Sequence, residues 1–203
     1  MLKVTLYQRI KKKIIIIYIG NAQLVANEMD NVYVVDSRTL STGIALIAIT
    51  GKELVDAGKE PKEIYEELIK LTEQVQASFV IEKLNYLHKG GRCSALTLLG
   101  ANILKIKPQI IVKEGRMNVG KKYVGGLSKV ISKYCDDLLL DNPNPKLDTG
   151  LITHSSPMPE IQEMLKEKLS TRGFNIIYDT LAGGTISSHC GPNCIGVLFI
   201  NEK

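Results

Sequence analysis

The sequence predicts an α/β protein built as two lobes. Runs of β-branched and aliphatic residues alternate with segments of helical periodicity, the pattern of an α/β domain. A chain of 203 residues is long enough for one good core or for two small lobes packed together. A second block of such signals begins near residue 76. We therefore expect an N-terminal lobe over residues 1–75, with parallel strands, and a C-terminal mixed-sheet lobe over residues 76–203, the two exchanging some segments.

The amino-acid composition limits which kinds of molecule the protein is expected to bind. With 44% hydrophobic and 23% charged residues, the chain resembles an ordinary globular protein. Aromatic residues are scarce and Trp is absent, which argues against stacking platforms for nucleic acid. The net charge of +5 is concentrated near the N-terminus, in Arg9, Lys11, Lys12 and Lys13. Such a cluster could touch acidic lipid or nucleic acid, but we favour a solvated face and expect at most transient membrane-surface contact.

The first block starts with an apolar run at residues 14–19 that is far shorter than the ~20 residues of a spanning helix. Lysines before it resemble a signal peptide, but the run is short and no cleavage site follows, so we expect a buried strand in a cytoplasmic protein. The elements expected next are a helix at 21–29, a strand at 31–37, a helix at 42–57 that is apolar on nearly all sides, and an amphipathic helix at 60–72.

The second block predicts a larger set of strands and helices. Two strands within residues 108–122 are joined by a turn at Glu114-Gly115, and an amphipathic helix covers 127–138. A helix opens at Pro159. Three further strands are expected at 77–82, 151–154 and 174–179. The composition of residues 141–150 predicts a loop. Residues 183–200 are expected to form a turn, then a polar loop and then a closing strand.

A first candidate site is the stretch Gly90-Gly91-Arg92. Glycines let backbone amides approach a ligand, and Arg92 could make a charge-assisted contact with an anion. Ser94 could cap an apolar helix directly behind it. A charged mouth backed by apolar walls suits an amphiphile with an acidic head, such as a long-chain carboxylate. A plain helix-entry turn explains the same residues equally well.

A second candidate is the loop at residues 185–197. His189 lies among donors and could bind a carboxylate or phosphate, although a lone loop histidine is more often structural. A Ser/His pair also suggests nucleophilic catalysis, but the nucleophile-elbow motif is missing. Cys190 and Cys194 could join His189 around zinc, yet no second Cys/His pair has suitable spacing, so we expect no metal. Four cysteines in a chain this long do not indicate a disulfide scaffold.

His154 and Ser155 end a predicted strand, where α/β proteins often place ligands. The glycine-rich phosphate-binding motifs of nucleotide-binding proteins are missing from the sequence. This argues against a nucleotide-hydrolysing enzyme.

Three segments together resemble one family. They are VYVVDSRTLSTGIALI, FVIEKLNYLHKGGRCSALTLLGANILKIKPQIIVKEGRM and AGGTISSHCGPNCIGVLFI. Their order, spacing and motifs, above all Leu-x-Tyr-Leu-x-x-Gly-Gly-Arg and His-x-Gly-Pro, are similar to those of the DegV family of bacterial fatty-acid-binding proteins. The resemblance runs from about residue 21 to the C-terminus.

The resemblance implies two α/β lobes that hold a long-chain fatty acid, with no cofactor and no catalysis by the chain itself. Relatives of this kind serve in phospholipid metabolism as acyl-binding subunits of fatty acid kinase, presenting the carboxylate to a separate ATP-dependent kinase subunit. The resemblance places four residues at the headgroup of the fatty acid: Arg92, His189, Gly91 and Ser188. It assigns the lining of an apolar tunnel to Leu96, Leu98, Leu99, Ile103 and Leu104.

Two departures from the family are expected to matter. The hydroxyl-rich segments that precede residue 21 in the family, and that grip the carboxylate, have no counterpart, so the chain is expected to be N-terminally truncated or rearranged, with an incomplete first lobe. Val124 stands where relatives usually carry an Arg. The missing segments suggest an alternative, a degenerate or partial chain that binds lipid weakly and acts as an interaction module. A further alternative is a hydrolase or phosphotransferase that uses His189 with Ser187 or Ser188.

Overall fold

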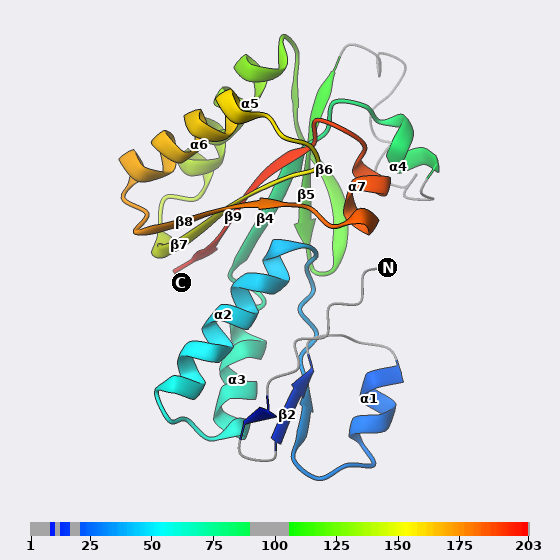
Figure 1. Ribbon diagram of the computed structural model, residues 1–203, viewed down its shortest axis with the longest axis vertical. Helices are drawn as coiled ribbons and strands as arrows, with labels where there is room; N and C mark the ends of the chain where they lie inside the picture. The colour runs from blue at the N-terminus through cyan, green and yellow to red at the C-terminus, as the bar shows by residue number, and fades with distance from the viewer. Residues whose placement is uncertain (1–8, 11–12, 17–20, 90–105, 203) are drawn as a thin grey trace.

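The computed structural model describes residues 9–10, 13–16, 21–89 and 106–202. Within these ranges the strands form a three-stranded sheet in the order β1-β2-β3 and a six-stranded sheet in the order β6-β5-β4-β9-β7-β8. Figure 1 shows the larger sheet above the smaller one, with α2 running from one to the other. The strands are β1 (Arg9–Ile10), β2 (Lys13–Ile16), β3 (Val32–Val34), β4 (Val75–Val80), β5 (Lys107–Lys113), β6 (Arg116–Tyr123), β7 (Pro145–His154), β8 (Ile176–Leu181) and β9 (Ile195–Asn201). The helices are α1 (Asn21–Ala26), α2 (Thr42–Asp56), α3 (Pro61–Leu71), α4 (Asn85–Lys89), α5 (Leu127–Asp141), α6 (Pro159–Arg172) and α7 (Gly184–Cys190).

The smaller sheet is covered by α2 and α3. β2 runs parallel to β3, as predicted for the first lobe, while β1 pairs antiparallel with β2. α3 begins at Pro61, whose fixed φ suits the first turn of a helix, and buries Ile64 and Leu68 on one face. These two side chains pack against Ile44 and Ile47 of α2 to form the core of this lobe.

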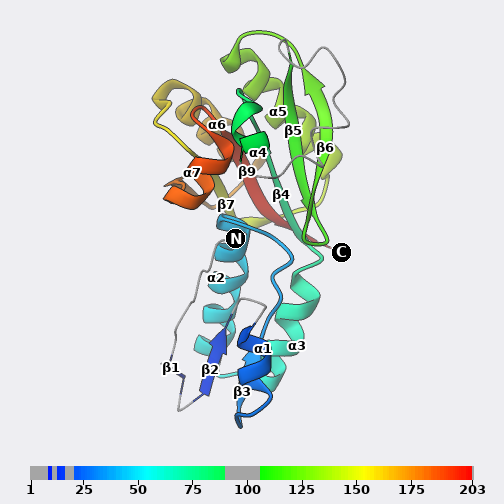
Figure 2. The same cartoon turned by 90° about the vertical axis from the view of Figure 1, so that its right-hand side faces the viewer.

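The larger sheet is mixed, as predicted. β7 and β8 are parallel, whereas β4, β5, β6 and β9 pair with antiparallel neighbours. The closing strand β9 is inserted between β4 and β7, near the middle of the sheet. Its alternating residues face opposite sides: Leu198 and Ile200 join the core under α2, and Val197 and Phe199 join the core under α5 and α6. Figure 2 shows α4 and α7 side by side in front of the larger sheet, and their buried residues join the same core as those of α2.

Several predicted elements are confirmed. The hairpin of β5 and β6 turns at Glu114-Gly115, where both residues have positive φ. α5 and α6 cover the predicted helical segments, and α2 buries residues on several sides, with Leu46 in the core of the larger sheet and Ile47 in the core of the smaller one.

Two expectations are wrong. The segment at 141–150 is not a loop, because β7 begins at Pro145 and gains partners in both β8 and β9. The polar segment before Gly191 is the helix α7 instead of a loop, and it begins after Gly183, whose carbonyl accepts the amide of Ser187 at 3.0 Å. Within the described ranges, no helix combines the length and apolar character needed to cross a bilayer.

Candidate ligand-binding site

A mostly apolar hollow lies between α7, the start of α2 and the face of the larger sheet that packs against α2. Its walls include Leu40, Ala77, Phe79, Ile186, Cys190 and Leu198. Gly196 also lines it, and any side chain there would collide with β4, since a Cβ would lie 2.5 Å from the Ser78 carbonyl oxygen. The cavity volume is about 30 Å³, which is room for roughly one water molecule.

The end of the apolar hollow that lies at the start of α2, here called its polar end, is lined by Ser41 and Thr153. His154 and Ser155 are also among the residues that line the hollow. Ser41 precedes the first turn of α2, so the amide end of this 15-residue helix, which carries partial positive charge, is directed at the hollow. Ser41 has a φ of 52°, and its hydroxyl accepts no capping hydrogen bond from the helix amides. The amide of Gly43 donates instead to the carbonyl of Leu40 at 3.1 Å.

A chain of three hydroxyls joins α2 to the sheet beside this end. Thr42 Oγ1 lies 2.5 Å from Thr153 Oγ1, which lies 3.0 Å from Thr180 Oγ1. Thr180 donates to the carbonyl oxygen of Ile152 at 3.2 Å. Because a carbonyl oxygen only accepts, Thr153 must donate to Thr180 and Thr42 to Thr153. The chain therefore fixes the start of α2 against β7 and β8.

The side chain of His154 lies on the face of the larger sheet that α6 covers, because it contacts Asp179, which is bonded to Gln162 and Lys166 of α6. The side chain is 7% exposed; its Nδ1 lies 3.0 Å from the carbonyl oxygen of Ser156, and its Nε2 lies 3.0 Å from Asp179 Oδ1. Both ring nitrogens of His154 are therefore engaged with neighbouring groups.

Asp179 is the acidic partner of His154. Burial alone would raise the pKa of Asp179, but the hydrogen bonds from Gln162 and Lys166, together with the charges of Lys166 and His154, hold that pKa below its ordinary value. Lys166 Nζ lies 3.0 Å from Asp179 Oδ2. His154, Asp179 and Lys166 thus form a polar cluster between β7, β8 and α6, on the other face of the larger sheet from the apolar hollow.

A second hollow is larger and unlike the first. Its volume is about 360 Å³, and Arg38, Glu73, Lys113 and Glu114 are among its lining residues. Charged groups of both signs surround it, so burying an alkyl chain there would cost the solvation of those charges. For an amphiphile, the apolar hollow is the better site of the two.

Comparison with known proteins agrees with the resemblance in the sequence. A family model described as "Uncharacterised protein, DegV family" matches residues 18–202. The chain belongs to the DegV family. A DegV domain-containing protein of Clostridium acetobutylicum is 29% identical to it over 175 residues, which cover 86% of this chain and 61% of that protein. The chain therefore spans about three-fifths of the length of this curated DegV relative.

Solved DegV structures share the fold. A protein from Thermus thermophilus, described by its fatty acid binding, superimposes with a TM-score of 0.79 at 23% identity, covering 89% of this chain and 65% of that one. A Ruminococcus gnavus protein with vaccenic acid gives a TM-score of 0.74 at 25% identity, covering 87% and 64%. The fatty acid kinase B3 protein of Streptococcus pneumoniae, loaded with linoleic acid, gives 0.71 at 20%, covering 90% and 64%.

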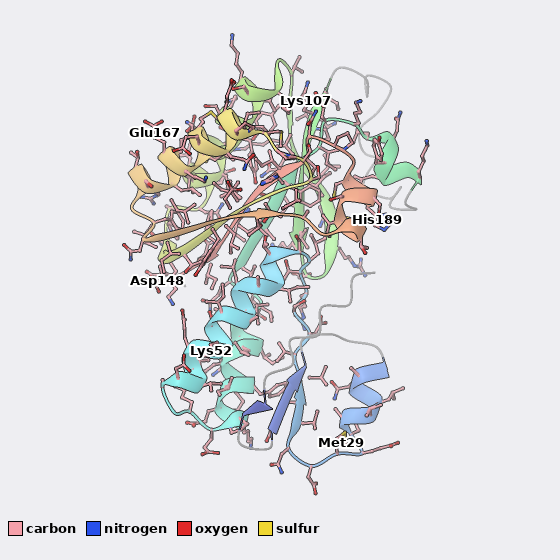
Figure 3. The ribbon with its side chains drawn as sticks, in the orientation of Figure 1. Met29, Lys52, Lys107, Asp148, Glu167 and His189 are labelled. Carbon is pink, nitrogen blue, oxygen red and sulfur yellow. The ribbon has the colours of Figure 1, made fainter. Side chains whose placement is uncertain are left out.

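The residues predicted for the DegV headgroup and tunnel fall in two groups. Arg92, Gly91 and the five tunnel residues from Leu96 to Leu104 lie outside the described residues, so their roles stay predictions. His189 and Ser188 lie on α7 (Figure 3 labels His189), but neither lines the apolar hollow, whereas their neighbours Ile186 and Cys190 do.

The serines beside His189 are engaged with the backbone. Ser187 donates its hydroxyl to the Ala182 carbonyl at 3.1 Å, and Ser188 donates to the Thr185 carbonyl at 2.9 Å. Neither hydroxyl proton is thus directed at the imidazole of His189, as a nucleophile and base pair would require. Among the described residues, no group of three or more His, Cys, Asp or Glu side chains is placed to hold a metal ion.

Sequence reasoning found His154 and Ser155 but missed Ser41, Thr153 and Asp179. A signal for Asp179 was present, because it lies near the end of a strand that runs parallel to β7. Carboxyl ends of adjacent parallel strands meet at one edge of a sheet. The sequence did not reveal which two strands were adjacent.

Proposed function

We propose that this chain binds a long-chain fatty acid and presents its carboxylate to a separate ATP-dependent kinase subunit, which forms the acyl phosphate. The chain is a carrier without chemistry of its own and works in the cytoplasm. The carboxylate lies at the polar end of the apolar hollow, and the tail extends along the apolar walls. Arg92, Gly91, His189 and Ser188 remain proposed headgroup residues.

The observation that carries this proposal is an apolar hollow at which the start of α2 is directed. The partial positive charge at the start of this 15-residue helix attracts an anion there. Each methylene group that leaves water for the apolar walls contributes about 0.8 kcal/mol. An amphiphile with an acidic head gains from both ends at once.

The small size of the hollow limits how the acyl tail can be held. About 30 Å³ is far less than a long acyl chain needs, so the tail must widen the hollow or run on beyond it. In this proposal the tail runs toward the predicted tunnel residues Leu96, Leu98, Leu99, Ile103 and Leu104, which follow α4 in the chain. α4 packs against α7 through Tyr86 and Gly191.

Relatives support the ligand and, more weakly, the partner. The Ruminococcus gnavus structure holds vaccenic acid at 25% identity to this chain, which supports a long-chain acid. The Streptococcus pneumoniae structure is of a fatty acid kinase B protein. The kinase partner is proposed on that likeness and on the family resemblance.

The proposal can be tested by a substitution on β4 that places a larger side chain in the hollow. Ala77→Val adds two methyl groups at a lining position that is 2% exposed, and a β-branched side chain suits a strand. We expect the free energy of unfolding to fall by about 1–3 kcal/mol at most while the affinity for a fluorescent long-chain acid falls about tenfold or more. Val130→Ile is the matched control, because it adds a methyl group in the other core of the same lobe.

Lipid extraction and mass spectrometry of the purified wild-type protein complete the test. A long-chain fatty acid should be recovered in near-stoichiometric amount. Recovery of none, together with no binding of added acid, would sink the proposal. Equal loss of affinity in Ala77→Val and Val130→Ile would show that the hollow is not the site.

A further inference from the structure

Two cysteines that the proposed function does not use lie side by side in the wall of the apolar hollow. Cys190 and Cys194 are both free thiols, each 5% exposed, and both line the hollow. Their side chains are hydrogen-bonded to each other. A pair of thiols in contact is the starting geometry for a disulfide, which requires only that the two sulfurs approach to about 2.05 Å.

The turn between the cysteines holds both in place. Ser155 Oγ donates to the carbonyl of Gly191 at 2.6 Å and accepts the amide of Cys194 at 3.1 Å, so one hydroxyl clamps both arms of the turn. Asn193 donates from its side chain to Glu82 at 2.8 Å. Gly191 and Asn193 have φ values of 73° and 57°, which turn the chain back on itself. The turn therefore holds the two thiols in hydrogen-bond contact with each other.

The thiols differ in acidity. The hydrogen bond from Cys194 lowers the pKa of Cys190 despite its burial, and the same bond, with burial, raises the pKa of Cys194. Cys135 is a contrast, because burial raises its pKa to about 12 and it lies in the other core of the lobe. Cys190 is thus the sulfur best suited to attack, and Cys194 is placed to resolve.

We propose that Cys190 and Cys194 form a peroxide-reactive dithiol that closes into an intramolecular disulfide in the wall of the ligand site. The hollow has room for about one water-sized molecule, and hydrogen peroxide is little larger. The Cys190 thiolate attacks one peroxide oxygen, the O–O bond breaks, and the departing hydroxide takes up the thiol proton to leave as water. Cys190 becomes a sulfenic acid.

The second step forms the disulfide. The sulfur of Cys194 attacks the sulfur of the sulfenic acid, the S–O bond breaks and the S–S bond forms. The hydroxyl group leaves with the Cys194 proton as a second water. Two electrons pass from the sulfurs to the peroxide, and any dithiol reductant reverses the change.

The disulfide should alter the ligand site. Closing it draws the end of α7, and with it His189, toward the start of β9. Gly191 has no space to move freely, because an added Cβ would lie 2.3 Å from the ring of Tyr86, so α4 must respond as well. This consequence rests on the proposed function, since it concerns fatty-acid binding, whereas disulfide formation does not depend on it.

The first experiment tests the disulfide alone. Delipidated protein is treated with hydrogen peroxide, free thiols are blocked, and non-reduced peptides are mapped by mass spectrometry. We expect the mass of the protein to fall by two hydrogen atoms and the peptides that carry Cys190 and Cys194 to be joined by a disulfide. Dithiothreitol should reverse both changes. Cys135→Ala should behave as wild type, and Cys190→Ser and Cys194→Ser should each abolish the linkage. A linkage through Cys135 or Cys93, or only irreversible oxidation, would overturn the proposal.

The second experiment tests the link to the ligand. Preloading with oleate should slow oxidation several-fold, and the oxidised protein should bind a fluorescent acid about tenfold more weakly, with recovery after reduction. If the reduced protein binds no acid while the disulfide forms, the proposed function fails and the dithiol stands. If both forms bind equally and oleate gives no protection, the disulfide does not act on the site and that part of the proposal falls.

Discussion

The hydroxyl of Tyr134 offers a sharp test of how the larger sheet is held together. Tyr134 is fully buried on α5, and its hydroxyl donates to the carbonyl of Ser78 on β4 at 2.8 Å and accepts the amide of Val197 on β9 at 3.1 Å. Ser78 and Val197 are opposite each other in the strand register. The hydroxyl therefore bridges two strands that line the apolar hollow on their other face.

Removing that hydroxyl by Tyr134→Phe keeps the ring and leaves no cavity. The carbonyl of Ser78 and the amide of Val197 each lose a partner in a buried site, which costs about 1–3 kcal/mol per group. Partial closure of the two strands would recover some of this. We therefore expect the free energy of unfolding to fall by about 2–4 kcal/mol. Burial raises the pKa of Tyr134 well above its ordinary value, so the hydroxyl stays protonated under all ordinary conditions.

The assay is urea denaturation followed by circular dichroism, with the slope of the transition compared between variants. Tyr178→Phe is the matched control, since Tyr178 is 45% exposed. We expect this control to lower the free energy of unfolding by no more than about 0.5 kcal/mol. A loss for Tyr134→Phe no greater than that of the control would show that the Tyr134 hydroxyl adds nothing to the pairing of β4 with β9, which would refute this prediction.

Two further predictions follow from the site. Gly191→Ala should destabilise the protein by about 2–4 kcal/mol in thermal or urea unfolding, because the new methyl group meets Tyr86 and the residue has a φ of 73°; wild-type stability would contradict the described turn. Since the pKa of Asp179 is lowered in the folded state, its contribution is complete above the ordinary carboxyl pKa of about 4 and is lost as the pH falls below it. Asp179→Asn should therefore cost about 1–3 kcal/mol at neutral pH and flatten the loss of stability below about pH 4, and an unchanged acid profile would contradict this.

Local chemistry was enough to predict many of the elements. The spacing of Val130, Ile131, Tyr134 and Leu138 predicted α5, and Glu114-Gly115 marked the hairpin turn. The segment at 145–150 was misread because Pro145 and Asp148 resemble loop residues. Two neighbouring strands outweigh such weak local preferences, because pairing satisfies the backbone on both sides of β7.

The sequence by itself determined the family, the α/β class and the presence of a histidine at the end of a strand. Only the tertiary structure decided that β9 lies between β4 and β7, that Asp179 faces His154, and that the start of α2 is directed at the apolar hollow. The physical reason is the range of the interactions. Helical periodicity and turn geometry are set by residues a few positions apart, whereas the charge and shape of the site depend on side chains 25 or more residues apart that meet only when the sheet forms.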